Sequence, residues 1–224
     1  MLDWGFALLA LLGTAFAFLR YQPSMDVYEQ AILLCGWPAV VWLAWFWRPL
    51  RTLMLVVTGL SLFAIYLYQG DLARAEQVFF LKYFLSSQSA ILWMSMVFFI
   101  STVFYWAGVF VRGQGDSLES LGSRMAWVAV GLALIGTLVR WYESHQLGPD
   151  IGHIPVSNLY EVFVLFCWMT AAFYLYYEAQ YKTRALGAFV MLVVSAAVGF
   201  CCGTPWCVRH TPSSPWCLPS KVGG

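Results

Sequence analysis

Cysteine and histidine, the side chains most often used for metal, redox and haem chemistry, lie mainly in two parts of this 224-residue sequence. Four of the six cysteines and one of the three histidines lie in the C-terminal stretch GFCCGTPWCVRHTPSSPWCLPSKVGG. The other two histidines lie in RWYESHQLGPDIGHIPVSNLYEVFVLFCW. Because thiolates and imidazoles bind metals, these two segments are the first candidates for a functional site.

The cysteines of the C-terminal stretch admit two chemical interpretations. They are Cys201, Cys202, Cys207 and Cys217. A metal-binding cluster is one, although they do not provide the two spaced cysteine pairs of a zinc motif. A disulfide-stapled outer loop is the other, since an oxidising periplasm permits disulfides. Cys35 and Cys167 instead lie inside apolar runs, where a free cysteine behaves as a small hydrophobic side chain.

The second segment has a polar pattern that predicts an ordered connection between two helices. Arg140 and Glu161 lie at the facing ends of these helices, so they are positioned to pair across the loop. Ser157 or Asn158 is suited to cap the second helix, with Glu161 as an acidic residue in its first turn.

His145 and His153 are the candidate ligands of this segment for a metal ion or haem iron. Two histidines eight residues apart match no metal-binding motif, so no metal site is predicted from them. The sequence contains no Walker A loop, H-E-x-x-H, G-x-S-x-G or C-x-x-C. It leaves open whether the chain is an enzyme, and the missing signatures favour a role without catalysis.

The elements that carry these residues are predicted to be membrane helices. The sequence is 61% hydrophobic and 10% charged, whereas soluble domains are about 25% charged. A bilayer needs roughly 17 to 25 apolar residues per helix. We therefore expect an all-α, polytopic bundle of about seven transmembrane helices, at approximately 3–19, 30–47, 50–68, 90–111, 125–140, 159–177 and 186–202.

The stretch 69–89 is too polar to span the membrane and too apolar for a loop, so we interpret it as an interfacial amphipathic helix. No repeat or linker divides residues 1–200, which we treat as one helical domain. The net charge of +1 gives no basic patch for nucleic acid.

The distribution of lysine and arginine between the loops predicts a cytoplasmic N-terminus. With that orientation, the cytoplasmic loops contain six of these residues and the outer loops contain four. Loop 141–158 and the C-terminal stretch would lie on the outer side. Tryptophans concentrate in CGWPAVVWLAWFW, where an aromatic belt at the membrane interface is one interpretation and a cofactor platform the other. They are Trp37, Trp42, Trp45 and Trp47.

The segment RWYESHQLGPDIGHIPVSNLYEVFVLFCW resembles the P-x-S/T-N-x-Y-E region of CcsA/ResC-type cytochrome c biogenesis proteins, also labelled CcsB. LARAEQVFFLKYFLSSQSAILWMSMVFF and TRALGAFVMLVVSAAVGF resemble the proteobacterial branch, so the likeness covers about residues 4–200. The residues that match the family signature are Arg140, Pro155, Ser157, Asn158, Tyr160 and Glu161.

This resemblance implies a part in System II cytochrome c synthase, in a bacterial inner (plasma) membrane. Such proteins bring haem to the outer face and present it to apocytochrome c for covalent attachment. The implied partners are a ResB-type large subunit, apocytochrome c and a thiol-reducing thioredoxin-like protein. In the family, a W-G-x-x-W-x-W-D platform and outer-face histidines hold the haem. That motif does not occur in this sequence, so we expect an inactive, truncated N-terminal portion.

The family continues after SAAVGF with a stretch such as LLWYTVVR and later IQPLVPALQSWW. When the codons for CCGTPWC are read in a shifted frame that starts at the third base of each codon, they can encode Leu-Trp-Tyr-Thr-Val-Val. The last valine has no alternative in that frame, because tryptophan has a single codon. Ser213 to Gly224 permit IQPLVPALQSWW in the same frame. A third interpretation of residues 201–224 is therefore out-of-frame translation after a frameshift or sequencing error near codon 200, and His210 is then no haem ligand.

Two other functions stay open at this point. A small-molecule transporter would require paired polar residues or broken helices at mid-membrane depth. A membrane thiol oxidoreductase would require accessible, low-pKa thiols among the C-terminal cysteines.

Overall fold

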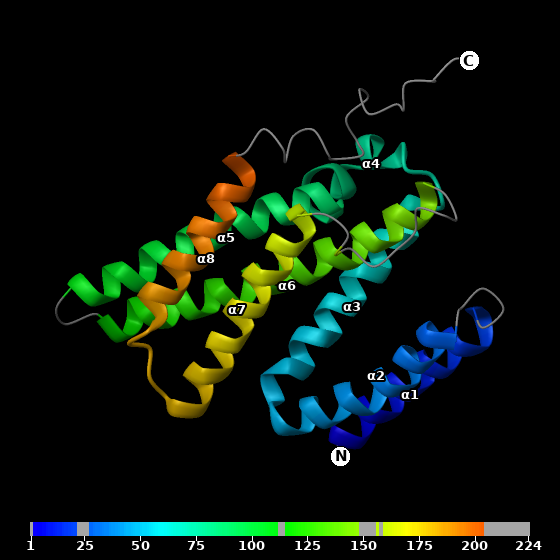
Figure 1. Ribbon diagram of the computed structural model, residues 1–224, viewed down its shortest axis with the longest axis horizontal. Coiled ribbons are helices and arrows are strands. Elements are labelled where there is room, and N and C mark those ends of the chain that lie inside the picture. Colours follow the sequence, from blue (N-terminus) through cyan, green and yellow to red (C-terminus); the bar gives the residue numbers. More distant parts are fainter. Residues whose placement is uncertain (1, 22–26, 112–114, 148–155, 157–158, 204–224) are drawn as a thin grey trace. The chain divides into compact units, whose positions relative to one another are not determined.

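The computed structural model describes residues 2–21, 27–111, 115–147, 156 and 159–203, and all regular secondary structure in these ranges is helical (Figure 1). The elements are α1 (Leu2–Tyr21), α2 (Val27–Phe46), α3 (Arg48–Tyr68), α4 (Arg74–Gln77), the π-helical turn η2 (Leu81–Leu85), α5 (Ser87–Phe110), α6 (Gly115–Leu147), α7 (Leu159–Tyr181) and α8 (Gly187–Gly203). The predicted all-α class is confirmed.

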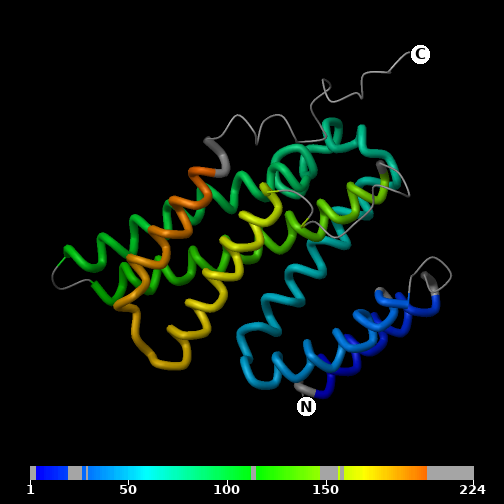
Figure 2. Tube along the Cα trace, in the orientation of Figure 1, coloured from blue at the N-terminus to red at the C-terminus, as the bar shows by residue number. Residues whose placement is uncertain are grey.

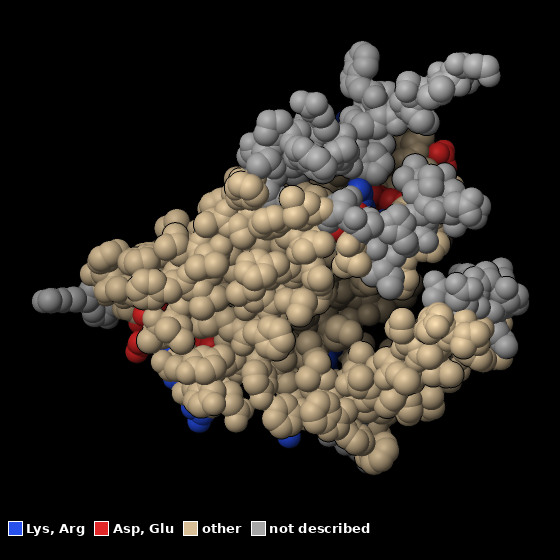
Figure 3. Space-filling view, viewed as in Figure 1, with Lys and Arg blue, Asp and Glu red and all other residues tan. Residues whose placement is uncertain are grey.

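Four helices, α3, α5, α6 and α7, are long and apolar enough to cross a membrane. Three shorter apolar helices, within α1, α2 and α8, coincide with the remaining predicted spans. Figure 3 shows a broad uncharged surface with acidic and basic side chains gathered near helix ends, as expected of a protein surrounded by lipid. The chain is a multi-pass membrane protein with four candidate spans in the part of the sequence that the structure describes, and the count of seven stays a prediction.

Helix α6 is much longer than its predicted span of 125–140, since it extends from Gly115 to Leu147. The prediction stopped where polar residues begin. In the structure the helix continues because polar groups at both ends have partners: Glu143 accepts hydrogen bonds from other helices, and the Asp116 carbonyl lies 3.4 Å from the Arg184 guanidinium.

The predicted single amphipathic helix over 69–89 is wrong. The segment instead contains the one-turn helix α4 and the π-helical turn η2. Gln69 and Gly70 have positive φ angles of 48° and 81°, which end α3 at Tyr68. Ser86 is extended and caps α5 by accepting a hydrogen bond from the Ser89 amide, which breaks the helix a second time.

The chain divides into two compact units, of which the first is Met1–Val56. Within it, α1 packs along α2, and the Trp37 indole N–H donates to the Ala7 carbonyl over 3.3 Å. Trp4 and Trp45 meet edge to face with ring centroids 5.4 Å apart. The proposed aromatic belt remains a prediction.

The second unit, Val57–Gly224, contains the main bundle. Helices α5 and α6 form an antiparallel hairpin, and α8 packs against α5 and α7 (Figures 1 and 2). Small residues line these contacts and let the backbones approach closely. The fully buried ones are Ala90, Ala126, Ala129, Ala133 and Ala171.

Hydroxyl groups bridge α5 and α8 inside this bundle. The Thr102 Oγ1 atom lies 2.7 Å from the Ser195 Oγ atom and 2.9 Å from the Met191 carbonyl oxygen. Both side chains are buried. In lipid, where water cannot replace them, such interhelical hydrogen bonds help to align the helices.

Candidate functional site

A buried ion pair joins α6 to α7. The Arg140 Nε atom donates to Glu161 Oε1 over 3.3 Å, and the two residues are only 8% and 9% exposed. Arg140 lies two turns before the end of α6, and Glu161 lies in the first turn of α7. The pairing predicted from the sequence is therefore confirmed, and it closes the base of the loop between these helices.

Glu143 lies one turn after Arg140 on α6 and joins two further helices. Its Oε1 atom accepts a hydrogen bond from the Tyr68 hydroxyl and another from the Ser87 amide over 3.2 Å. Its Oε2 atom accepts a hydrogen bond from the Ser87 hydroxyl. Tyr68 is the last residue of α3 and Ser87 the first of α5. A single carboxylate thus holds the ends of three helices together.

These two sets of contacts form one polar cluster, which consists of Tyr68, Ser87, Arg140, Glu143 and Glu161. Buried charges are costly unless they are paired and hydrogen-bonded. The buried Glu161 carboxylate meets this condition through Arg140, and the half-buried Glu143 carboxylate is held by hydrogen bonds from Tyr68 and Ser87. The cluster is suited to fixing the positions of four helix ends, those of α3, α5, α6 and α7.

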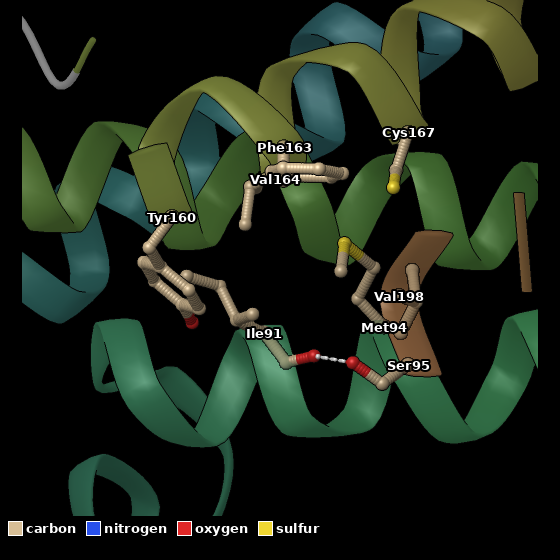
Figure 4. A pocket seen from close by; sticks show the side chains of 8 residues that line it. All are labelled: Ile91, Met94, Ser95, Tyr160, Phe163, Val164, Cys167 and Val198. Carbon is tan, nitrogen blue, oxygen red and sulfur yellow. Dashed lines mark hydrogen bonds between the residues drawn. The ribbon is translucent and has the colours of Figure 1, made fainter. Parts of the chain in front are cut away.

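A small cavity lies between α5, α7 and α8 (Figure 4). Its volume of about 10 Å³ has room for about one water molecule. Tyr160 and Cys167 of α7 line it, together with Met94 and Ser95 of α5. The Ser95 hydroxyl donates to the Ile91 carbonyl within its own helix, so the lining is largely apolar.

A second polar network lies at the opposite end of α7. Glu178, 8% exposed, accepts a hydrogen bond from the Tyr105 hydroxyl over 2.7 Å and another from the Arg184 Nε atom over 3.0 Å. The hydrogen bond that Arg184 donates to Glu178 raises the pKa of Arg184, which lies between α7 and α8 and stays positively charged. This network joins α5, α7 and the α7–α8 connection.

Haem ligation has little support among the residues that the structure describes. His145 is exposed on the last turns of α6, where its Nδ1 atom lies 3.1 Å from the Trp141 carbonyl oxygen. In the described ranges no three His, Cys, Asp or Glu side chains gather as a metal site would require. Haem iron needs only one or two axial ligands, so this result concerns metal sites with several ligands, and no haem site is shown among the described residues.

The other residues singled out from the sequence have different outcomes. Tyr160 lines the cavity. Several others lie outside the described residues, so their expected capping and ligand roles stay predictions; these are His153, Pro155, Ser157, Asn158, Cys207, His210 and Cys217. Cys35 is exposed and Cys167 is buried, and neither forms a disulfide among the described residues.

Sequence reasoning missed Glu143 and Glu178, because both were placed just outside the predicted spans. A signal for Glu143 was present. It follows Arg140 by three residues, which places both side chains on one face of a helix. For Glu178 the nearby Arg184, six residues further on, was such a signal, whereas its other partner Tyr105 lies 73 residues away and gave none.

Comparison with known proteins finds several that are named cytochrome c biogenesis protein CcsA. The one from Chlorella vulgaris is 29% identical over 109 residues, which cover 47% of this chain and 31% of that protein. The one from Gloeobacter violaceus is 33% identical over 102 residues, covering 45% and 28%. The one from Trichormus variabilis is 30% identical over 106 residues, covering 46% and 27%.

The aligned region therefore amounts to less than one third of the length of these relatives. No protein-family model matches the chain. No solved structure matches it either.

Proposed function

Since this chain is homologous to CcsA cytochrome c biogenesis proteins at about 30% identity over about half of its length, we propose that it is part of a protein of cytochrome c maturation. The proposed task of that protein is to handle haem and deliver it at the outer face of a bacterial inner membrane, for covalent attachment to apocytochrome c. The similarity to CcsA is the observation that carries this proposal.

Within such a protein, the polar cluster would serve to position the outer loop. The Arg140–Glu161 pair joins the two helices from which the loop 148–158 emerges, and the loop carries three of the six signature residues. With the N-terminus in the cytoplasm, this loop faces the outer side. There it would meet the proposed partners: a ResB-type subunit, apocytochrome c and a thioredoxin-like thiol reductant.

The haem platform itself is proposed to lie outside this sequence. No haem site is shown among the described residues, and W-G-x-x-W-x-W-D does not occur in the 224 residues. We therefore expect the chain alone to be inactive in haem attachment. When the chain is purified from haem-replete membranes, its absorption spectrum should lack a stoichiometric Soret band, and a stoichiometric band would refute this expectation.

Residues 201–224 are proposed to be out-of-frame translation. Both codon stretches that permit family-like sequence do so in the same shifted frame. Sequencing the coding DNA beyond codon 200 tests this directly. The shifted frame should run on into W-G-x-x-W-x-W-D, and a stop codon or an unrelated sequence there would refute the frameshift.

A maturation assay tests the function. The chain and a frame-restored version are each co-expressed with a ResB-type subunit and an apocytochrome c, in a host without its own maturation system. Haem-stained cytochrome c should appear with the restored version and not with the chain. No staining from a stably inserted restored version would refute the proposed function, whereas staining from the chain would refute only its inactivity.

A further inference from the structure

The connection between α3 and α5 carries a group of exposed aromatic side chains. Together with one residue from α5 they form what we call the aromatic cluster: Phe79, Phe80, Tyr83, Phe84 and Trp93. Their exposed fractions run from 42% for Trp93 to 62% for Phe79. Four large rings in six consecutive residues is a high density for a connection that would face water.

The rings of the aromatic cluster contact one another and form a continuous surface. Phe84 and Trp93 stack with centroids 5.8 Å apart and planes only 5° from parallel. Phe79 contacts Tyr83 at a centroid distance of 5.0 Å. The Trp93 indole N–H donates to the Tyr83 carbonyl over 2.7 Å, which ties the connection to α5.

The backbone beneath these rings is held in place from the inside. Leu81 is fully buried and Leu85 is 7% exposed, so the apolar side of η2 is already used for packing. The ends of the connection are fixed as well, because Tyr68 and Ser87 both donate to Glu143. The aromatic rings therefore cannot turn inward without breaking these contacts.

We propose that the aromatic cluster anchors the protein in the phospholipid interface. The chain leaves one candidate membrane span at Tyr68 and enters the next at Ser87, so the connection lies close to a membrane surface. Aromatic rings are enriched at this depth. Lys82 is exposed with its Nζ atom 5.8 Å from the Tyr83 ring centroid, where its charge can reach lipid phosphates.

The half of the connection nearest α3 has the opposite character, which orients the proposed anchor. Asp71 and Glu76 are exposed there, and the Asp71 carboxylate accepts a hydrogen bond from the Ala73 amide. This acidic half would face water while the aromatic half enters the lipid. The proposal is independent of the function in cytochrome c maturation.

Fluorescence quenching in phosphatidylcholine vesicles tests the proposal on the full chain. In a background with all six cysteines replaced, single cysteines are introduced as Phe80→Cys, Asp71→Cys or Val103→Cys and labelled with bimane. Val103 is 65% exposed in the middle of α5 and serves as the lipid control. Quenching is measured with brominated acyl chains and with aqueous iodide.

The label at Phe80→Cys should lose at least half as much fluorescence to brominated lipid as the label at Val103→Cys, and iodide should quench it less than the label at Asp71→Cys. Iodide quenching equal to that at Asp71→Cys, without lipid quenching, would overturn the proposal. Protection from both quenchers would also overturn it, because another protein surface would then cover the cluster.

A second measurement does not depend on the cysteine-free background. The unmodified chain is reconstituted with a phosphatidylcholine that carries a photoreactive diazirine near the glycerol, and adducts are mapped by mass spectrometry. Adducts should concentrate on residues 79–84 and on Trp93 rather than on residues 71–77. An even distribution over both halves, or adducts confined to 71–77, would contradict a lipid anchor.

Discussion

Removing the carboxylate of Glu161 provides the sharpest test of how the bundle is held together. The variant Glu161→Leu leaves Arg140 in place without its carboxylate partner at a site where only 8% of the arginine is exposed. Breaking a buried ion pair by removing one partner costs roughly 3–5 kcal/mol, because an uncompensated charge stays buried. The Nε–Oε1 distance of 3.3 Å is longer than the roughly 2.8 Å of strong charged hydrogen bonds, so we expect a cost of about 3 kcal/mol, at the lower end of this range.

The double variant Arg140→Met/Glu161→Leu separates the cost of the stranded charge from the value of the pair. Replacing both partners of a buried ion pair by apolar residues of similar volume is often neutral or stabilising. We therefore expect the double variant to unfold within about 1 kcal/mol of the wild type. The coupling energy between the two positions would then be several times the average of about 0.6 kcal/mol for hydrogen bonds between membrane helices.

The free energies of unfolding are measured by titrating SDS into detergent micelles and following the far-ultraviolet circular dichroism. Glu76→Gln is the matched control, since Glu76 is exposed and its charge should matter by less than about 0.5 kcal/mol. A coupling energy below about 0.6 kcal/mol would show that the pair is an ordinary interhelical contact. If the double variant lost as much free energy of unfolding as the two single variants together, the argument that the cost comes from the unpaired Arg140 charge would be refuted.

Two further substitutions test the packing of the bundle. Gly187→Ala should abolish folding or cost more than about 3 kcal/mol of unfolding free energy, because the added Cβ atom would overlap the buried ring of Tyr105. Gly59→Ala is its control, since nothing lies within 4 Å of the added atom. This control should leave the SDS midpoint of unfolding unchanged or raise it. Thr102→Ala should cost about 1 kcal/mol through the lost contacts with α8, whereas Thr58→Ala on the exposed face of α3 should be neutral. Equal effects in either matched pair would contradict the packing described here.

The helices were predictable because their signal is local. Each predicted span consists of apolar residues long enough to form a helix by itself, and all seven coincide with apolar helices. The connection 69–89 was predicted wrongly as one helix, because the average polarity of the stretch does not reveal a break. The break depends on two residues in the left-handed region and on the capping serine Ser86.

The candidate site was only partly predictable, for a different reason. Arg140 and Glu161 flank one loop, so their pairing follows from neighbouring helix ends. The role of Glu143 depends on Tyr68 and Ser87, which are 75 and 56 residues away in the sequence. Such contacts become visible only after the helices are packed, since no local pattern says which helix end lies beside which.

The distribution of polar contacts explains how a largely apolar bundle acquires a defined arrangement. Lipid tails are as apolar as the helix surfaces, so burial of apolar side chains does little to select one packing over another. Small residues permit close contact between α5 and α6 without fixing how far one helix slides along the other. The carboxylates of Glu143 and Glu178 fix it at opposite ends, since sliding α6 or α7 by one turn would separate each carboxylate from its donors. For Glu178, which is 8% exposed, the separated charge would also be buried.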